Sequence, residues 1–150
     1  MARYSLKTVR VTLTVDEPPP KKLTQSADAV AVLRPIFAGL DADQEHIVLL
    51  TLNNAMRVTG FKVIASGSMT ASLIDPKIIF RTALLLGATR IMIAHNHPSS
   101  DTMPSSADAS ITRRIAEVGK ALDMPLEDHI ILGDNTGRWH SAREEGELTV

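Results

Sequence analysis

The stretch Ile91-Met92-Ile93-Ala94-His95-Asn96-His97-Pro98 determines how the rest of the chain is interpreted. An apolar run that ends in two histidines two positions apart is typical of a buried strand, because strand side chains alternate between two faces. We therefore expect His95 and His97 to point to one face and to reach the same small ligand. Pro98 and Pro104 each lack a backbone N–H and have a fixed φ, so the segment between them is predicted to be a loop.

A predicted helix follows this loop and brings a carboxylate to the histidines. Apolar residues recur at helical spacing at Ile111, Ile115, Val118 and Leu122. This spacing places Asp108 in the first turn of the helix, beside the end of the histidine strand. Two imidazoles and one carboxylate form a three-ligand set for a metal such as Zn²⁺, and a catalytic zinc site keeps its fourth position open for water. The chain has no cysteine, so no thiolate closes the site.

The spacing of these residues is similar to a known motif. His95, one residue, His97, seven residues, Ser105, two residues and Asp108 resemble the JAMM motif of the JAB/MPN metalloprotease domain family. Three segments resemble the RadC-like branch of that family in particular: His95-Asn96-His97-Pro98-Ser99, Pro104-Ser105 and Asp128-His129-Ile130-Ile131. The resemblance covers about Tyr4 to Gly146.

Two departures from the pattern of the branch are visible. Ser100 stands where Gly is usual, and Asp75-Pro76-Lys77-Ile78 stands where a His-Pro-Arg-Glu run is usual, although Arg81 fits the pattern. Neither departure removes a metal ligand, so they affect the expected loop shape and not the expected ligand set.

The resemblance implies a fold, a metal and a reaction. The implied fold is α/β, a single JAB/MPN-like domain over residues 1–150 with helices packed on a mixed β-sheet in a cytidine-deaminase-like sandwich. The implied cofactor is one zinc ion per chain, held by His95, His97 and Asp108. The implied activity is that of a JAMM-type zinc metallohydrolase, a peptidase or isopeptidase that cleaves an amide bond through a metal-activated water.

Such a hydrolase needs a carboxylate that takes a proton from water and passes it to the leaving amine. We predict that Glu45 has this role, because it begins the apolar run that ends at Leu52 and matches the upstream Glu of the motif. Glu127 and Glu17 are alternatives on less suitable segments. A solvated glutamate at a strand end is the structural alternative for Glu45.

Ser105, near the helix N-terminus, is predicted to donate a hydrogen bond to the developing oxyanion. The alternative is that Ser105 and Asp108 only form a capping box, because Ser-x-x-Asp before a helix has that pattern. Metal-bound imidazoles commonly donate their other N–H to a carboxylate, which makes Asp128 and His129 candidates for supporting the ligands. A purely structural hydrogen-bonded pair is the alternative, and His46 and His140 receive no role.

The remaining elements follow from periodicity and turn residues. In chain order we predict a strand at 9–15, a helix at 26–37 capped by Thr24 or Ser26, a central strand at 45–52 paired in a hairpin with 58–65, a buried helix at 78–86 ended by Gly87, the histidine strand, a helix at 106–121, a strand at 124–132 and a short strand near Trp139. Residues 18–22, Pro-Pro-Pro-Lys-Lys, are expected to be a solvated connector. Residues 1–8 and 143–150 are expected to fray.

Composition limits the partners. With 150 residues and 44% hydrophobic composition, one domain is the expected organisation. The chain has 16 basic and 17 acidic residues, so its charges nearly balance and we expect no specific nucleic-acid binding. The chain has neither an apolar signal sequence nor a run long enough to span a bilayer, so we expect a cytoplasmic protein with no membrane partner. The expected partner is an unidentified peptide or protein substrate, and a homo-oligomer is possible.

Three other functions are compatible with parts of the sequence. One is a non-catalytic JAB/MPN scaffold that binds a partner, because fold alone does not guarantee activity, but the intact ligand set argues against it. Another is a DNA-repair-associated RadC-like protein, which the balanced charge and the lack of room for a helix-hairpin-helix segment disfavour. A His-Asn-His nuclease is disfavoured by the absence of cysteine pairs and of a basic surface.

Overall fold

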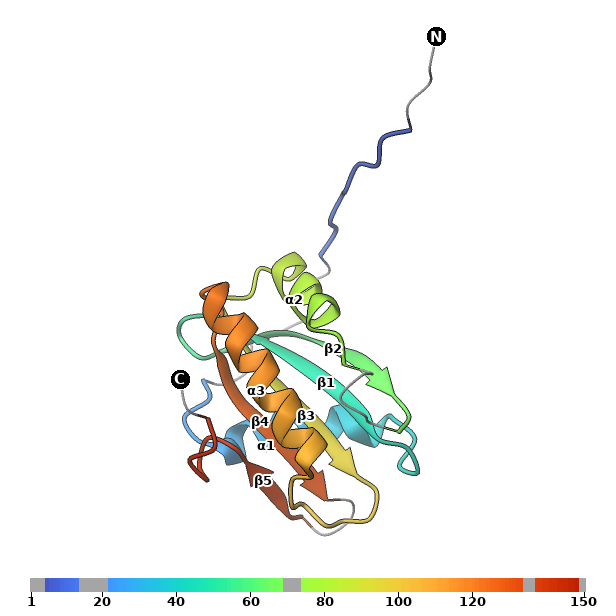
Figure 1. Ribbon diagram of the computed structural model, residues 1–150, viewed down its shortest axis with the longest axis vertical. Coiled ribbons are helices and arrows are strands. Elements are labelled where there is room, and N and C mark those ends of the chain that lie inside the picture. Colours follow the sequence, from blue (N-terminus) through green and yellow to red (C-terminus); the bar gives the residue numbers. More distant parts are fainter. Residues whose placement is uncertain (1–4, 14–21, 69–73, 134–136, 149–150) are drawn as a thin grey trace.

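The computed structural model describes residues 5–13, 22–68, 74–133 and 137–148. The elements in chain order are α1 (Ser26–Ala38), β1 (His46–Leu52), β2 (Val58–Ser66), α2 (Pro76–Leu85), β3 (Arg90–His97), α3 (Ser106–Ala121), β4 (Leu126–Gly133) and β5 (Trp139–Ser141). The strands form one sheet in the order β2-β1-β3-β4-β5 (Figure 1). Among the described strands, β3 and β4 alone pair in parallel and the other pairs are antiparallel, so the sheet is mixed, as the sequence predicts.

The sheet is covered by helices on both faces. Helix α1 packs on one face, and α2 and α3 pack on the other. Successive side chains of β1 pack alternately in the two hydrophobic cores. Leu49 lies in the core under α2 and α3, whereas Leu50 lies in the core with α1. Every residue of β1 is buried. Burial on both faces explains why the sequence of this strand is almost continuously apolar.

The βαβ unit made by β3, α3 and β4 positions the predicted site. Because β3 and β4 are parallel, α3 must cross back over the sheet, and its first turn lies beyond the carboxyl end of β3. Ile91 and Ile93 of β3 belong to the core under α2 and α3. The alternation continues along the strand, so His95 and His97 point to the same face, toward α3.

The close approach of α3 to the following loop depends on a glycine. A Cβ atom on Gly119 would lie 2.5 Å from the carbonyl oxygen of Met124, closer than van der Waals contact allows. The N–H of Met124 also donates to the carbonyl of Gly119 at 2.8 Å. The absence of a side chain at Gly119 therefore lets β4 begin directly beneath the end of α3.

The N-terminal strand prediction is wrong in the residues that the structure describes. Residues 9–13 form no strand, and Val9, Val11 and Leu13 are 82%, 47% and 54% exposed. Their alternating pattern satisfies strand periodicity, but no strand in the described part of the chain pairs with them. Residues 14 and 15, and the connector up to residue 21, lie outside the described residues.

Two details of the helices differ from expectation. Helix α1 is capped at Gln25, and the Asp28 carboxylate accepts the backbone N–H groups of Thr24 and Gln25 at 2.8 and 3.1 Å. Helix α2 begins at Pro76 after the Asp75 cap and is followed by Gly87 at φ +68°, as predicted. Only one face of α2 is buried, however, because Leu84 is 58% exposed.

The segment after β5 packs against α1 and β4. The Glu144 carboxylate accepts the backbone N–H of Ser26 at 2.9 Å, and the Ser26 hydroxyl accepts the indole N–H of Trp139 at the same distance. The backbone N–H of Arg143 donates to Asp128 at 3.0 Å. No helix in the described part of the chain is both long enough and apolar enough to cross a membrane.

Candidate metal centre

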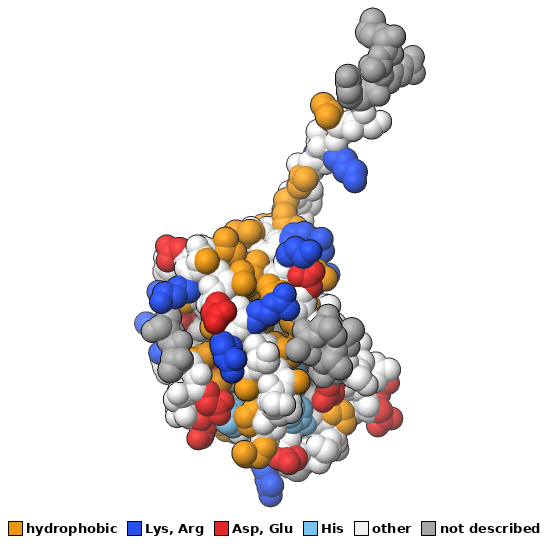
Figure 2. Space-filling model, in the orientation of Figure 1, with side chains coloured by type: hydrophobic (Ala, Val, Ile, Leu, Met, Phe, Trp, Pro, Cys, Tyr) orange, Lys and Arg blue, Asp and Glu red, His pale blue; other side chains and the backbone are white. Residues whose placement is uncertain are grey.

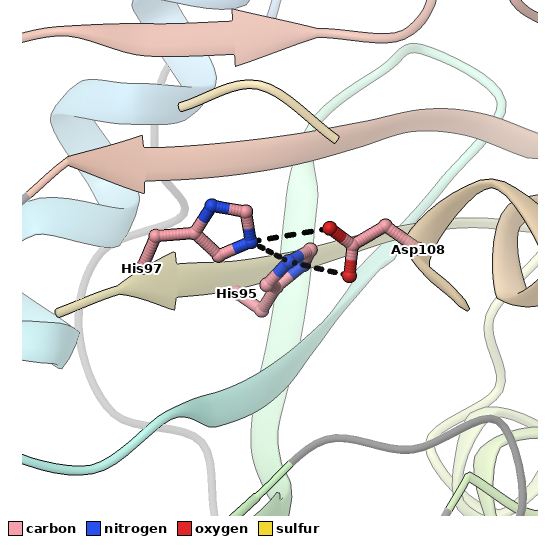
Figure 3. Close-up of side chains that lie close together, drawn as sticks. All are labelled: His95, His97 and Asp108. Carbon is pink, nitrogen blue, oxygen red and sulfur yellow. Dashed lines mark hydrogen bonds and ion pairs between the residues drawn. The ribbon is translucent and has the colours of Figure 1, made fainter. Parts of the chain in front are cut away.

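Three predicted ligands converge at the carboxyl end of β3. The Nε2 atom of His95 lies 3.1 Å from Oδ1 of Asp108, and the Nε2 atom of His97 lies 3.1 Å from Oδ2 of the same carboxylate (Figure 3). The two Nε2 atoms are 2.9 Å apart. A single small cation can therefore contact one atom from each of the three side chains.

The cluster is largely removed from solvent. The side chains of His95, Asp108 and His97 are 1%, 6% and 13% exposed. Burying a carboxylate is costly unless a positive charge compensates it. The group is thus built to receive either a proton or a metal ion, and its deepest member is His95.

A backbone carbonyl fixes the proton of His97. The Nδ1 atom of His97 lies 2.6 Å from the carbonyl oxygen of Asp101 in the loop after β3. A carbonyl only accepts, so Nδ1 carries the hydrogen and Nε2 of the neutral ring keeps its lone pair. This lone pair faces the cluster.

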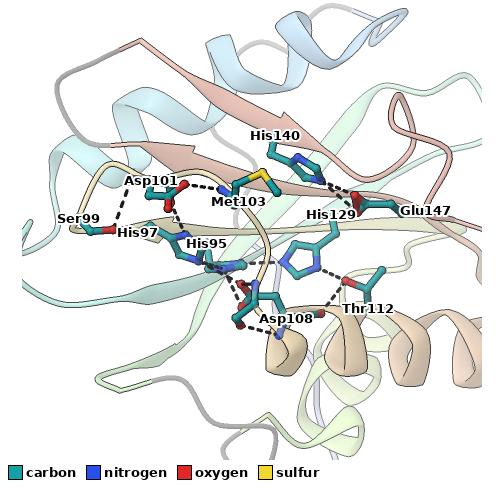
Figure 4. Close-up of polar contacts among 11 residues, drawn as sticks. His95, His97, Ser99, Asp101, Met103, Asp108, Thr112, His129, His140 and Glu147 are labelled. Atoms are coloured by element: carbon teal, nitrogen blue, oxygen red, sulfur yellow. Dashed lines mark hydrogen bonds and ion pairs between the residues drawn. The ribbon is translucent and has the colours of Figure 1, made fainter.

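A chain of three residues fixes the proton of His95 (Figure 4). The hydroxyl of Thr112 donates to the carbonyl of Asp108 at 2.9 Å, so its oxygen accepts from Nδ1–H of His129. The Nε2 atom of His129 is then the acceptor for Nδ1–H of His95, at 2.7 Å. The chain leaves Nε2 of His95 unprotonated and directed at the cluster, as a metal ligand requires.

The donor chemistry fits a metal ion. Two lone pairs at 2.9 Å repel each other unless a cation or a proton lies between them. Without a metal, the hydrogen bond to Asp108 raises the pKa of His97 against the effect of burial, which lowers it. Burial acts to raise the pKa of Asp108, but the hydrogen bonds from His95 and His97 outweigh it and hold this pKa below its usual range.

Ser105 and Asp108 also form the capping box that the sequence left open as an alternative. The N–H of Ser105 donates to Oδ2 of Asp108 at 2.7 Å, and the N–H of Asp108 donates to the Ser105 hydroxyl at 3.1 Å. Ser105 is thus the N-cap of α3. Capping orients the carboxylate toward the histidines, so the two interpretations of Asp108 are compatible.

Glu45 lies directly before β1 and is half-buried. The β1–β3 register pairs Ile47 with His95, which places Glu45 on the His97 side of the cluster. Its negative charge acts to raise the pKa of His97, in agreement with this position. Glu45 is not one of the three grouped ligands, and its predicted chemical role stays a prediction.

The other glutamates lie elsewhere. Glu127 forms ion pairs with Arg90 and Arg143 near the start of β4. Because the ligands lie at the opposite, carboxyl end of β3, Glu127 is not placed beside them. Glu17 lies outside the described residues.

The pair Asp128 and His129 is divided between two environments. His129 contacts His95, whereas Asp128 accepts hydrogen bonds from the Ser141 hydroxyl at 2.5 Å and from the N–H of His129 at 2.7 Å. Burial lowers the pKa of His129 well below its ordinary value, so this ring is neutral and can accept from His95. Thr112 was not identified from the sequence, although its position four residues after Asp108 places it on the same helix face.

A cavity of about 520 Å³ adjoins the cluster between α3 and the β4–β5 end of the sheet. The residues that line the cavity include Asp108, Thr112, His129, Ile131, Ala142 and Leu148. His140, which received no role, lines the cavity and pairs with Glu147 at 2.9 Å. On the face that carries α2 and α3, basic and acidic side chains are interspersed (Figure 2).

Comparisons with known proteins give a consistent assignment. The sequence model of the RadC-like JAB domain matches residues 23–147. A UPF0758 protein of Listeria monocytogenes is 42% identical over 119 residues, which cover 79% of this chain and 51% of the relative. UPF0758 proteins of Symbiobacterium thermophilum and Methanococcoides burtonii are 38% and 34% identical over 78% and 87% of this chain, and over 48% and 56% of their own lengths. The chain thus spans about half the length of these curated relatives.

Proposed function

Because the chain belongs to the RadC-like JAB domain family, we propose that it is a zinc-dependent hydrolase that cleaves an amide bond in a peptide or protein. The observation that carries this proposal is the convergence of two imidazoles, each with an unprotonated Nε2, and one carboxylate at a largely buried site. Two histidines and a carboxylate are a common ligand set of catalytic zinc.

His95, His97 and Asp108 are the residues that would hold the ion. Zinc bound there would supply a Lewis acid and a water ligand acidic enough to ionise near neutral pH. Thr112 and His129 would keep the hydrogen of His95 on Nδ1, and Asp101 would do the same for His97. These contacts hold the ligands in the protonation state that metal binding needs.

Glu45 would accept the proton of the attacking water and transfer it to the leaving amine. Its place on the His97 side of the cluster supports this role. The hydroxyl of Ser105 would donate to the oxyanion, because its oxygen already accepts the N–H of Asp108 and its own hydrogen can point elsewhere.

The test separates metal binding from chemistry. Protein purified without chelator and offered zinc should contain about one zinc per chain by elemental analysis, and His97→Ala should lose it. Glu45→Gln should keep the zinc but lose cleavage of a mixture of fluorescence-quenched peptides by about 100-fold or more. A wild-type protein without stoichiometric metal, or a zinc-loaded one that cleaves no amide in linear or isopeptide-linked probes, contradicts the proposal.

A further inference from the structure

The side chain of Asn96 makes contacts that the metal centre does not explain. Asn96 lies between the two histidines of β3 and is 2% exposed. Its Oδ1 accepts the N–H of His46 at 2.7 Å, and its Nδ2 donates to the carbonyl of Gln44 at 2.9 Å. One amide therefore holds the backbone on both sides of Glu45.

Main-chain pairing between β1 and β3 stops before it reaches Glu45. The β1–β3 register ends at the pair Ile47 and His95, one residue before the level of Asn96. Beyond that pair, the side-chain amide of Asn96 forms the hydrogen bonds that connect β3 to the backbone of Gln44 and His46. On the other side, the N–H of Gly67 donates to the carbonyl of Glu45 at 2.9 Å. The backbone at Glu45 is thus held from both neighbouring strands.

The geometry requires an asparagine at this position. The contact needs one acceptor for an N–H and one donor for a carbonyl at the end of a short side chain. An aspartate at 96 keeps the acceptor but presents an oxygen to the Gln44 carbonyl, and an alanine keeps neither group. The orientation of the Asn96 amide follows from its partners, because the backbone N–H of His46 can only donate.

We propose that Asn96 is a positioning residue that fixes the backbone from which Glu45 reaches the metal centre. This inference rests on the function proposed above, in which Glu45 moves a proton. A general base must lie within hydrogen-bond reach of the proton that it takes, and a displacement of about 1 Å can cost about 100-fold in rate. The residue between two metal ligands thereby links the ligand strand to the base.

Asn53 provides a matched control at the opposite end of β1. Its Oδ1 accepts the N–H groups of Ala55 and Arg57, both at 3.0 Å, in the turn between β1 and β2. Like Asn96, it holds a short backbone segment through two hydrogen bonds. It lies far along the strand from Glu45, so Asn53→Ala should disturb the turn and leave the Glu45 segment in place.

The first measurement is amide hydrogen exchange by NMR on the metal-free protein. In Asn96→Ala we expect the amides of His46 and Gly67 to exchange at least ~10-fold faster, relative to the Ile93 amide of the core. Gly67 is the decisive site, because it follows β2 on the other side of β1 from Asn96 and its N–H donates to Glu45, so a displaced Glu45 segment would release it. In Asn53→Ala both amides should keep their wild-type rates.

The second measurement is kinetic, with a quenched peptide that the wild-type protein cleaves. Asn96→Ala should retain one zinc per chain and a KM within about threefold, while kcat falls about 10- to 100-fold. Added to Glu45→Gln, the same change should cost less than about threefold, because the group that Asn96 positions is already inactive. Asn53→Ala should keep the wild-type kcat.

The outcomes separate the two proposals. A wild-type protein that cleaves no amide contradicts the hydrolase proposal, whereas the exchange rates still decide whether Asn96 holds the Glu45 segment. Unchanged exchange at Gly67 in Asn96→Ala overturns the inference, whatever the activity. An equal loss of kcat in the wild-type and Glu45→Gln backgrounds also overturns it, because the loss would then be general structural damage.

Discussion

The Nδ1 atom of His95 lies 2.7 Å from the Nε2 atom of His129, so two buried imidazoles share one hydrogen bond. The second ring supports the first as an acceptor, a position that a carboxylate often takes beside a metal-bound histidine. Burial lowers the pKa of His129, so this ring stays neutral and adds no positive charge beside the cluster, whereas a carboxylate in its place would add a second negative charge beside Asp108. Thr112 completes this support from α3.

We predict that His129→Phe weakens zinc binding by about 10- to 100-fold, because the Nδ1–H of His95 loses its acceptor while a ring of similar shape remains. Competition with a chromophoric zinc chelator measures the affinity. His140→Phe is the control, since His140 lies nearby and pairs with Glu147 but makes no hydrogen bond to a ligand. An unchanged affinity in His129→Phe would show that His129 does not support the site.

The sequence was sufficient for the part of the fold that positions the ligands. Two prolines mark the loop between β3 and α3, and the helical spacing after them predicts 106–121, where the structure has Ser106–Ala121. The apolar run that ends in His-Asn-His likewise predicts a buried strand, and the structure has β3 there. These patterns are local, so they can be identified without knowledge of the neighbouring elements.

What the sequence could not supply are contacts between distant segments. Thr112 and His129 lie 17 residues apart and meet only because β4 returns beside α3. The contact of Asn96 with Gln44 spans 52 residues. Residues 9–13 show the opposite error, because their alternating pattern predicts a strand but the described residues offer them no partner strand.

We predict that Gly119→Ala lowers the free energy of unfolding by about 1–3 kcal/mol, because the new Cβ would lie 2.5 Å from the Met124 carbonyl oxygen. The better helix propensity of alanine, about 1 kcal/mol, opposes this loss without cancelling it. Urea denaturation followed by circular dichroism measures the change. Gly39→Ala is the control, because its Cβ would make only ordinary contact at 3.6 Å. Equal stabilities of the two variants would refute the close approach.

We predict that the stability difference between the wild-type protein and Asp128→Asn depends on pH. Burial raises the pKa of Asp128, although the hydrogen bond from Ser141 acts to lower it. The stability that this group contributes is therefore fully present below the unfolded carboxyl pKa of about 4 and is lost as pH rises through the higher folded pKa. Asparagine does not titrate, so the wild type should lose stability relative to the variant across that window.

The measurement for Asp128 is urea denaturation at several pH values between about 3.5 and 7, in chelator. Glu144→Gln is a comparison of opposite sign, because the hydrogen bonds from Ser26 lower the pKa of Glu144. Its contribution is present above the unfolded pKa and is lost as pH falls through the folded pKa. A stability difference between wild type and Asp128→Asn that stays constant with pH would contradict the assigned direction.

Finally, we predict weak and unspecific DNA binding. The chain has 16 basic and 17 acidic residues, and the exposed basic residues Arg113 and Lys120 of α3 flank the acidic Glu117. Phosphate contacts dominate unspecific affinity and weaken steeply with salt, so binding should vanish near physiological ionic strength. Glu117→Lys should join these charges into one basic patch, raise the affinity at low salt and steepen its salt dependence by about one contact. Titration of labelled single- and double-stranded oligonucleotides measures this. Sub-micromolar binding by the wild-type protein at physiological salt would refute the prediction and favour a function on DNA.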